Sequence, residues 1–280
     1  MTSRIIPHLL EPYLSLPEET ALVVLTGILG ASTNWLVWRY LHAFLKPSAP
    51  TSTEDDEVSV LLVSFLRDLA FFKEGMGRLG VDLEAAGRKG KFGFVDGLSG
   101  LYTEDSRPTS TVQREETWKR TLRSGNVKDI GRAIENLLVQ LKPGAAGTET
   151  RRKVILVLDG LDFLVAAASG VDNTGAVAVR DMVMDLREKS HGTIITLAAD
   201  DPLIKEQVTP LETNHACFVL SLAHDADTIL SLRLLDTGTA KDVSGVIRIT
   251  HGGQNFDTKD HEYLYNVGGD GGVRVFERGQ

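Results

Sequence analysis

The strongest constraint on this chain is a strand, a glycine-bearing turn and a helix that follow one another between residues 21 and 45. Residues 21–26 are apolar and rich in Val and Leu, residues 27–31 contain two glycines, and residues 34–41 have helical character. A strand that leads into a helix through such a turn is the setting of a nucleotide-binding P-loop. The segment therefore predicts an α/β fold.

The turn lacks the residues that would bind and activate a nucleotide. With Gly27 as the first glycine of G-x-x-x-x-G-K-[ST], Ser32 stands at the second glycine, Thr33 at the lysine and Asn34 at the Mg²⁺-binding hydroxyl. The lysine supplies positive charge to the β- and γ-phosphates, and a threonine cannot. Together with Gly30, these residues form a degenerate nucleotide loop. They predict the architecture of an NTPase without its chemistry.

Apolar runs and helical periodicity alternate through the first 200 residues, which predicts a mainly parallel sheet with helices on both faces. Further strands are predicted at 58–65, 92–95, 154–158 and 193–199. Apolar stripes at helical spacing lie at 66–79, 127–141 and 179–186. Later runs without helical spacing predict antiparallel strands at 216–222, 229–235, 243–250, 262–267 and 273–276. Parallel strands first and antiparallel strands last is the layout of RecA-like domains.

The 280 residues are interpreted as a single domain, because apolar strands resume after each polar segment. Residues 1–19 are interpreted as an N-terminal extension. Surface loops are predicted at 46–57, 102–126 and 142–152, where Pro, Ser, Thr, Gly or charged residues accumulate.

A second motif ends the strand at 154–158. Its apolar residues are followed by Asp159, the pattern of a Walker B strand, whose carboxylate holds the water shell of Mg²⁺. The alternative is a buried strand whose first polar residue caps the next turn. After the strand at 92–95, where RecA-like ATPases usually place a glutamate base, the next glutamate is Glu104, inside a predicted loop. No catalytic residue is assigned.

Composition argues against a free-standing nucleic-acid binder, because the chain has 30 basic and 38 acidic residues and a net charge of −8. RecA-like proteins touch nucleic acid with the loop that here spans 200–214, and its single lysine, Lys205, is the candidate contact. The seven histidines and one cysteine show no metal-ligand spacing, so neither a metal nor a cofactor is predicted.

Residues 20–38 are uncharged over nearly the length that spans a bilayer, but their Gly, Thr, Ser and Asn fit a buried strand, turn and helix better. No membrane contact is predicted. Prolines and glutamates in the first nineteen residues argue against a signal peptide. Cys217, the single cysteine, lies in an apolar run. It is expected to be buried and fits a reducing compartment such as the cytoplasm.

Three phrases of the sequence resemble the Elongator complex protein 6 family in its fungal form. They are LGASTNWL at 29–36, VSFLRD at 63–68 with FKEG at 72–75, and FVDGLS at 94–99. The resemblance implies a RecA-like fold without functional Walker motifs. It also implies a heterohexameric ring with the sister Elongator subunits four and five, attached to the remaining Elongator subunits. That ring binds tRNA and supports modification of the wobble uridine, in the cytoplasm and also in the nucleus.

Two hypotheses follow. The first is a non-catalytic ring subunit that acts through assembly and tRNA binding. The second is an active NTPase that binds nucleotide through backbone amides of residues 27–33 and uses catalytic groups of a neighbouring subunit.

Overall fold

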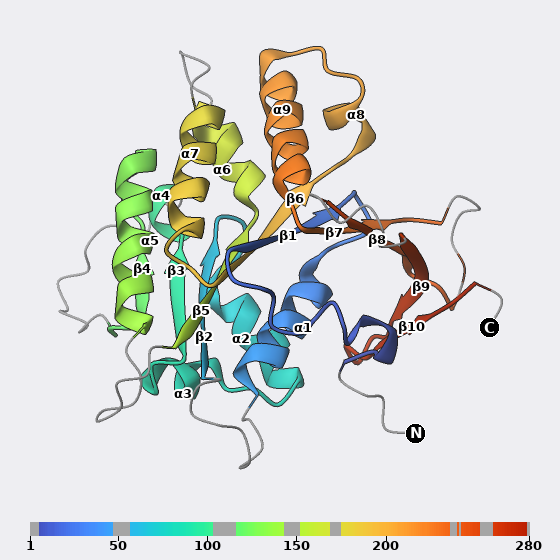
Figure 1. Ribbon diagram of the computed structural model, residues 1–280, viewed down its shortest axis with the longest axis horizontal. Helices are drawn as coiled ribbons and strands as arrows, with labels where there is room; N and C mark the ends of the chain where they lie inside the picture. The colour runs from blue at the N-terminus through green and yellow to red at the C-terminus, as the bar shows by residue number, and fades with distance from the viewer. Residues whose placement is uncertain are drawn as a thin grey trace.

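The computed structural model describes residues 6–46, 57–102, 116–142, 152–168, 175–235, 240, 242–252 and 260–278. These residues build one ten-stranded sheet in the order β10-β9-β8-β7-β1-β6-β5-β2-β3-β4, with helices on both faces (Figure 1). The strands from β7 to β4 in this order are parallel, and β8, β9 and β10 continue the sheet in antiparallel fashion. The predicted α/β architecture is confirmed.

The strands are short and mostly buried. Their bounds are β1 Ala21–Gly27, β2 Val58–Ser64, β3 Phe92–Asp96, β4 Lys119–Thr121, β5 Lys153–Asp159, β6 Gly192–Ala198, β7 Thr228–Arg233, β8 Gly245–His251, β9 His261–Val267 and β10 Val273–Phe276. The first strand, β1, lies at the centre between β6 and β7, so that Ala21 pairs with Gly192 and Val23 with Thr228.

Two apolar cores cover the two faces of the sheet, because successive side chains of a strand point to opposite sides. Val23 and Leu25 of β1 belong to one core, and Leu22 and Val24 belong to the other. The first core is closed by η1 (His8–Leu10), α1 (Asn34–Leu45), α2 (Leu69–Arg78) and α3 (Leu83–Arg88). The second is closed by α5 (Val127–Leu141), α6 (Leu161–Ala168), α7 (Gly175–Arg187) and α9 (Pro210–Asp225), as Figure 1 shows. Short helices α4 (Ser99–Tyr102) and α8 (Asp201–Ile204) follow β3 and β6.

The prediction of a strand at 216–222 is wrong, because these residues lie within helix α9. Thr209 and Glu212 form a capping box at its start, and Pro210 occupies its first turn. These signals fix a helix whose buried side chains recur at helical spacing. Cys217 consequently lies on the exposed face of α9, contrary to its expected burial.

Two further segments differ from the sequence prediction. The predicted loop at 102–126 contains the edge strand β4 and the buried Trp118, which packs against Phe92. The N-terminal extension is part of the fold, since Leu10 and Leu14 are buried in the first core. Residues 47–56, 103–115 and 143–151, which make up most of the predicted loops, lie outside the described residues.

The uncharged segment at 20–38 divides into β1, a turn and the first part of α1. Within the described ranges, no helix combines the length and apolarity that a bilayer crossing requires.

Helix α2 offers a matched pair of glycines that tests how closely α1 and α2 pack. A Cβ atom on Gly75 would lie 2.3 Å from Cε2 of the Trp38 indole, whereas a Cβ on Gly77 would meet nothing within 4 Å. We expect Gly75→Ala to lower the free energy of unfolding by about 1–3 kcal/mol through overpacking. Gly77→Ala should raise it by about 0.5–1 kcal/mol, because alanine restricts the unfolded chain and favours helix.

Urea unfolding followed by circular dichroism measures both changes. Equal effects of the two substitutions would contradict the close approach of Gly75 to the indole ring.

Candidate functional site

The sequence-predicted site residues gather at the carboxyl edge of the parallel strands, where α/β proteins bind ligands. Gly27 ends β1, Asp159 ends β5, and Lys205 follows α8, which lies beyond the end of β6. The strand β6 lies between β1 and β5, so the degenerate loop and Asp159 are separated by one strand.

The turn after β1 is folded onto itself. The amide of Ala31 donates to the carbonyl of Ile28 at 2.8 Å, and these two residues form an isolated β-bridge. Gly30, at the third position of this turn, has φ +89°, which turns of type II require and glycine adopts without strain. The carbonyl oxygen of Ala31 lies 2.7 Å from the place where a Cβ on Gly27 would stand. The backbone therefore closes against the end of β1.

Backbone amides of this turn donate hydrogen bonds to acceptors within the protein. The amide of Leu29 donates to Oδ1 of Asp200 at 2.7 Å, and the amide of Asn34 donates to Oγ of Ser32 at 3.2 Å. A P-loop instead directs its amides toward phosphate oxygens. A carboxylate on the Leu29 amide takes the place that an anionic ligand would need.

Thr33 and Asn34 form the start of α1. Thr33 is its N-cap residue and its side chain accepts no capping hydrogen bond, while Asn34 is the first helical residue. Neither position carries the cationic or hydroxyl group that the corresponding P-loop positions supply.

Asp159 lies at the centre of a buried hydrogen-bond network that joins three neighbouring strands. Its Oδ2 accepts from Oγ of Ser64 in β2 at 2.8 Å, and its Oδ1 accepts from Oγ1 of Thr196 in β6 at 3.0 Å. Thr196 in turn accepts from the amide of Gly160 at 2.8 Å. Only 3% of the Asp159 surface is exposed. The carboxylate is thus enclosed by its neighbours and ties the strand ends together.

The environment of this carboxylate changes its acidity. Burial raises the pKa of Asp159 above its ordinary value, and the hydrogen bonds from Ser64 and Thr196 oppose that rise. Burial likewise raises the pKa of Asp162, in the first turn of α6, with the Asp162 and Ala198 amides and His215 acting in the opposite direction. His215 is itself buried and its Nε2 lies 2.9 Å from the carbonyl oxygen of Ala198.

Lys205 is paired within its own short helix region. Its Nζ lies 2.9 Å from Oδ1 of Asp201, in an exposed ion pair. The role of Lys205 as a nucleic-acid contact stays a prediction. In the part of the chain that the structure describes, no three His, Cys, Asp or Glu side chains are grouped so that they could hold a metal ion.

Sequence reasoning identified Asp159 and missed its partners. Ser64 and Thr196 stand near the ends of neighbouring apolar runs, and Ser64 is the register partner of Asp159. Polar residues at matching ends of adjacent buried strands were the available signal. Asp200 gave no comparable signal, because its contact with Leu29 depends on the path of the chain after β6.

Large apolar side chains accompany most strand ends along this edge. Leu234 follows β7, Leu29 follows β1, Phe163 follows β5 and Leu66 follows β2. The exposed large hydrophobic side chains of this edge, named here the carboxyl-edge surface, are Leu29, Leu66, Tyr102, Phe163, Val208, Leu211 and Leu234. Leu29 is 87% exposed and Val208 is 88% exposed, and Tyr102 and Phe163 contact each other edge to face. This edge thus carries seven exposed large apolar side chains beside polar ones such as Ser32 and Asp201.

The Asp159 network predicts a specific pH dependence. Because the folded-state pKa of Asp159 is raised, the folded protein favours the protonated acid. Stability is then lost as pH rises from the unfolded to the folded pKa. Asp159→Asn removes this loss. We therefore expect the free energy of unfolding of Asp159→Asn, relative to the parent, to increase as pH rises above the ordinary aspartate pKa of about 4.

Thr196→Val should act in the opposite direction, because it removes a hydroxyl that donates to the carboxylate and so steepens the loss of stability with pH. Denaturant unfolding at several pH values measures both slopes. A difference between Asp159→Asn and the parent that does not change with pH would contradict the raised pKa.

Comparison with known proteins identifies the family of this chain. The family model described as "Elongation complex protein 6" matches residues 15–267. The Elongator complex protein 6 homolog of Schizosaccharomyces pombe is 24% identical over 273 residues, covering 95% of this chain and 94% of the relative. Elongator complex protein 6 of Rattus norvegicus is 25% identical and that of Homo sapiens 24%, each covering 83% of this chain and 81% of the relative.

Two solved structures from Pyrococcus horikoshii have the same fold. A KaiC-like protein of Pyrococcus horikoshii OT3 has a TM-score of 0.58 at 18% identity, covering 97% of this chain and 96% of its own. An uncharacterized protein of Pyrococcus horikoshii, solved with an unknown peptide, has a TM-score of 0.61 at 12% identity. The match covers 99% of this chain and 100% of that protein. With its parallel sheet and antiparallel C-terminal strands, the chain has a RecA-like fold, and it belongs to the Elongator complex protein 6 family.

Proposed function

We propose that this chain is a non-catalytic subunit of a heterohexameric RecA-like ring of the Elongator complex. In this role it supports modification of the tRNA wobble uridine through ring assembly and tRNA binding. The observation that carries the proposal is the carboxyl-edge surface. Large apolar side chains exposed along one edge of a soluble protein favour a protein interaction site there.

The arrangement of the carboxyl-edge surface fits a subunit neighbour. Of the exposed large hydrophobic side chains among the described residues, only Val139, Val177 and Leu220 lie elsewhere, each on a different helix. The rest follow the ends of neighbouring strands, so that they share one edge of the molecule. The partners that we propose are the sister Elongator subunits four and five, with the remaining Elongator subunits beyond them.

The closed turn supports a non-catalytic role. Its Leu29 and Ala31 amides already have protein acceptors, and Thr33 stands where a P-loop has lysine. Opening the turn to a phosphate would expose the carboxylate of Asp200 to a second anion, which is unfavourable. The alternative, an NTPase that uses groups of a neighbouring subunit, would require this rearrangement.

Charge favours tRNA binding by the assembled ring rather than by the lone chain. The net charge is −8, and Lys205 is already paired with Asp201. We propose no cofactor for this chain, no membrane contact, and a cytoplasmic location with the nucleus as a second site.

A matched pair of surface substitutions tests the assembly role. Leu29→Glu places a charge on the carboxyl-edge surface, where Leu29 is 87% exposed, and Val139→Glu places the same charge on α5, where Val139 is 57% exposed. On co-expression with sister subunits four and five, we expect Leu29→Glu to reduce ring recovery about tenfold or more, because an interface core excludes an unpaired charge. Val139→Glu should leave recovery unchanged.

Size-exclusion chromatography with light scattering measures the assembly, and labelled tRNA titrated into its peak measures binding. A ring that forms equally well with Leu29→Glu, or a parent chain that ignores both sister subunits, would contradict the proposal.

Restoring the missing lysine tests the non-catalytic role. We expect Thr33→Lys to leave ATP turnover at the background level, because Asn34 still lacks the Mg²⁺-binding hydroxyl and the turn amides stay occupied. Phosphate release by the assembled ring with parent or Thr33→Lys chain is the measurement. A large gain in turnover from this single change would favour the NTPase alternative.

A further inference from the structure

Arg39, in the middle of α1, is a buried cation with a single hydrogen-bond acceptor. Only 1% of its surface is exposed. Its Nη2 donates to the carbonyl of Gly271 at 2.7 Å, whereas its Nε and Nη1 atoms are buried and have no hydrogen-bond partner among the described residues. An arginine keeps its charge inside a protein, and a buried charge without a counter-charge is costly.

The residues around Arg39 that the structure describes do not supply the missing counter-charge. Helix α1 contains no Asp or Glu, and His42, one turn further along, is itself buried with an unpartnered Nδ1 atom. The acid next to Gly271 in the sequence is Asp270. Its side chain is exposed and accepts from the amide of Gly272 at 2.9 Å. The guanidinium is therefore held by one neutral carbonyl.

This carbonyl belongs to residues 268–276, named here the C-terminal strap, which comprise a tight turn and strand β10. Four of the five turn residues are glycines, at 268, 269, 271 and 272. Glycine regains more backbone freedom on opening than any other residue. Strand β10 has four residues, lies at the end of the sheet beside β9 (Figure 1), and buries only Val273 among its side chains. Few contacts hold the strap closed, and its opening is favoured by entropy.

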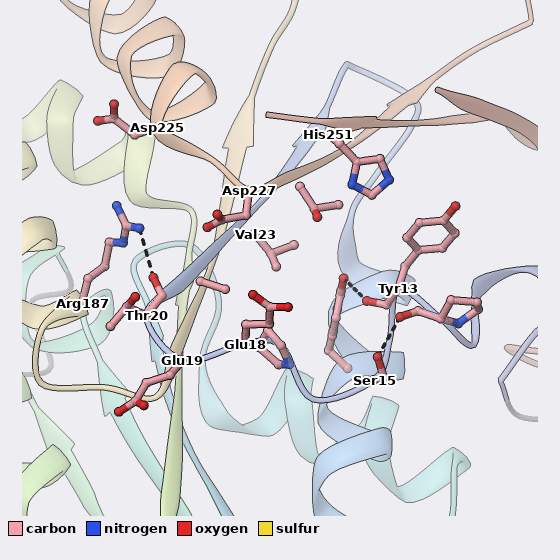
Figure 2. Close-up of a pocket in the computed structure, with 15 residues that line it drawn as sticks. Tyr13, Ser15, Glu18, Glu19, Thr20, Val23, Arg187, Asp225, Asp227 and His251 are labelled. Atoms are coloured by element: carbon pink, nitrogen blue, oxygen red, sulfur yellow. Dashed lines mark hydrogen bonds between the residues drawn. The ribbon is translucent and has the colours of Figure 1, made fainter. Parts of the chain in front are cut away.

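The opposite end of β9 is anchored by the N-terminal segment. The Tyr13 ring lies 6.0 Å between centroids from His251 of β8, beside which Figure 2 shows it, and 6.3 Å from His261 at the start of β9. The Tyr13 hydroxyl lies 3.1 Å from Nδ1 of His261, and the Tyr40 hydroxyl donates to the Tyr13 carbonyl at 2.9 Å. The strap can therefore open at its turn while β9 stays in the sheet.

We propose that the C-terminal strap is a latch that opens locally, and that the buried charge of Arg39 favours its opening. In the closed state the guanidinium is shielded from water and bonded to Gly271 alone. In the open state water solvates the guanidinium, and the outer edge of β9 is uncovered. The latch lies apart from the Asp159 network and does not depend on the proposed ring function.

Hydrogen exchange of the full chain, followed by mass spectrometry, tests the latch. Arg39→Met removes the charge and keeps an unbranched side chain of similar length. We expect amide exchange in the strap to slow about tenfold relative to exchange in β2, because the open state no longer gains the solvation of a cation. Gly271 is partly exposed, so water can replace the guanidinium at its carbonyl.

The matched control is Arg78→Met, which removes the same charge beside the same turn. The Cδ atom of Arg78 lies 4.0 Å from the place where a Cβ on Gly271 would stand, but the side chain is 51% exposed and paired with Glu74. Exchange in the strap should stay within about twofold of the parent, because an exposed charge is already solvated. Unchanged or faster exchange in Arg39→Met, or equal slowing by both variants, overturns the proposal.

A second neutral variant covers the case in which Arg39→Met does not fold by circular dichroism. Arg39→Gln is also uncharged and retains N–H groups that can donate to the carbonyl of Gly271. The strap of this variant should likewise exchange more slowly than that of the parent. If neither neutral variant folds, the charge is required for the closed state, and the proposal is overturned.

Discussion

The hydrogen bonds around Asp159 hold together the edge on which the rest of the site is built. Ser64, Asp159 and Thr196 come from three adjacent parallel strands, and each contributes its side chain at the same level of the sheet. A buried carboxylate is costly unless it is hydrogen bonded, so the three residues stabilise the structure only as a set. The Asp159 carboxylate faces its own neighbours and belongs to the core.

The polar groups of the turn after β1 are also bonded within the protein. Its amides bond to Ile28 and Asp200, and the side chain that emerges from it is the exposed Leu29. Phosphate recognition needs free amides and positive charge, whereas recognition of a protein surface needs apolar area that water leaves readily. The exposed Leu29 and the other apolar side chains of the carboxyl-edge surface have the second property.

Much of this fold could be predicted from local pattern, and the failures have physical causes. The buried strands β2, β5 and β6 are short, mostly apolar runs that lie between segments with helical spacing. Such runs are typical of parallel strands that are covered on both faces. Residues 216–222 are also apolar except for Ser221, and the capping box ahead of them is the local signal that favours helix over strand. At the site, the missing lysine was visible in the sequence. The contact of Asp200 with Leu29 was not, because it joins residues far apart in the chain through a path that only the folded sheet defines.

The central place of β1 in the sheet determines the order in which the protein can fold during synthesis. Its neighbours on both sides, β6 and β7, are among the later segments to leave the ribosome, since Val23 pairs with Ile194 and Thr228. Until then the apolar β1 and α1 have no sheet to join, and pairing over such a separation is slow. The nascent chain carries an unpaired hydrophobic strand near its start for most of translation. The sheet topology therefore gives the first segment of the chain the longest wait for its partners, and an unpaired apolar strand is prone to aggregation during that time.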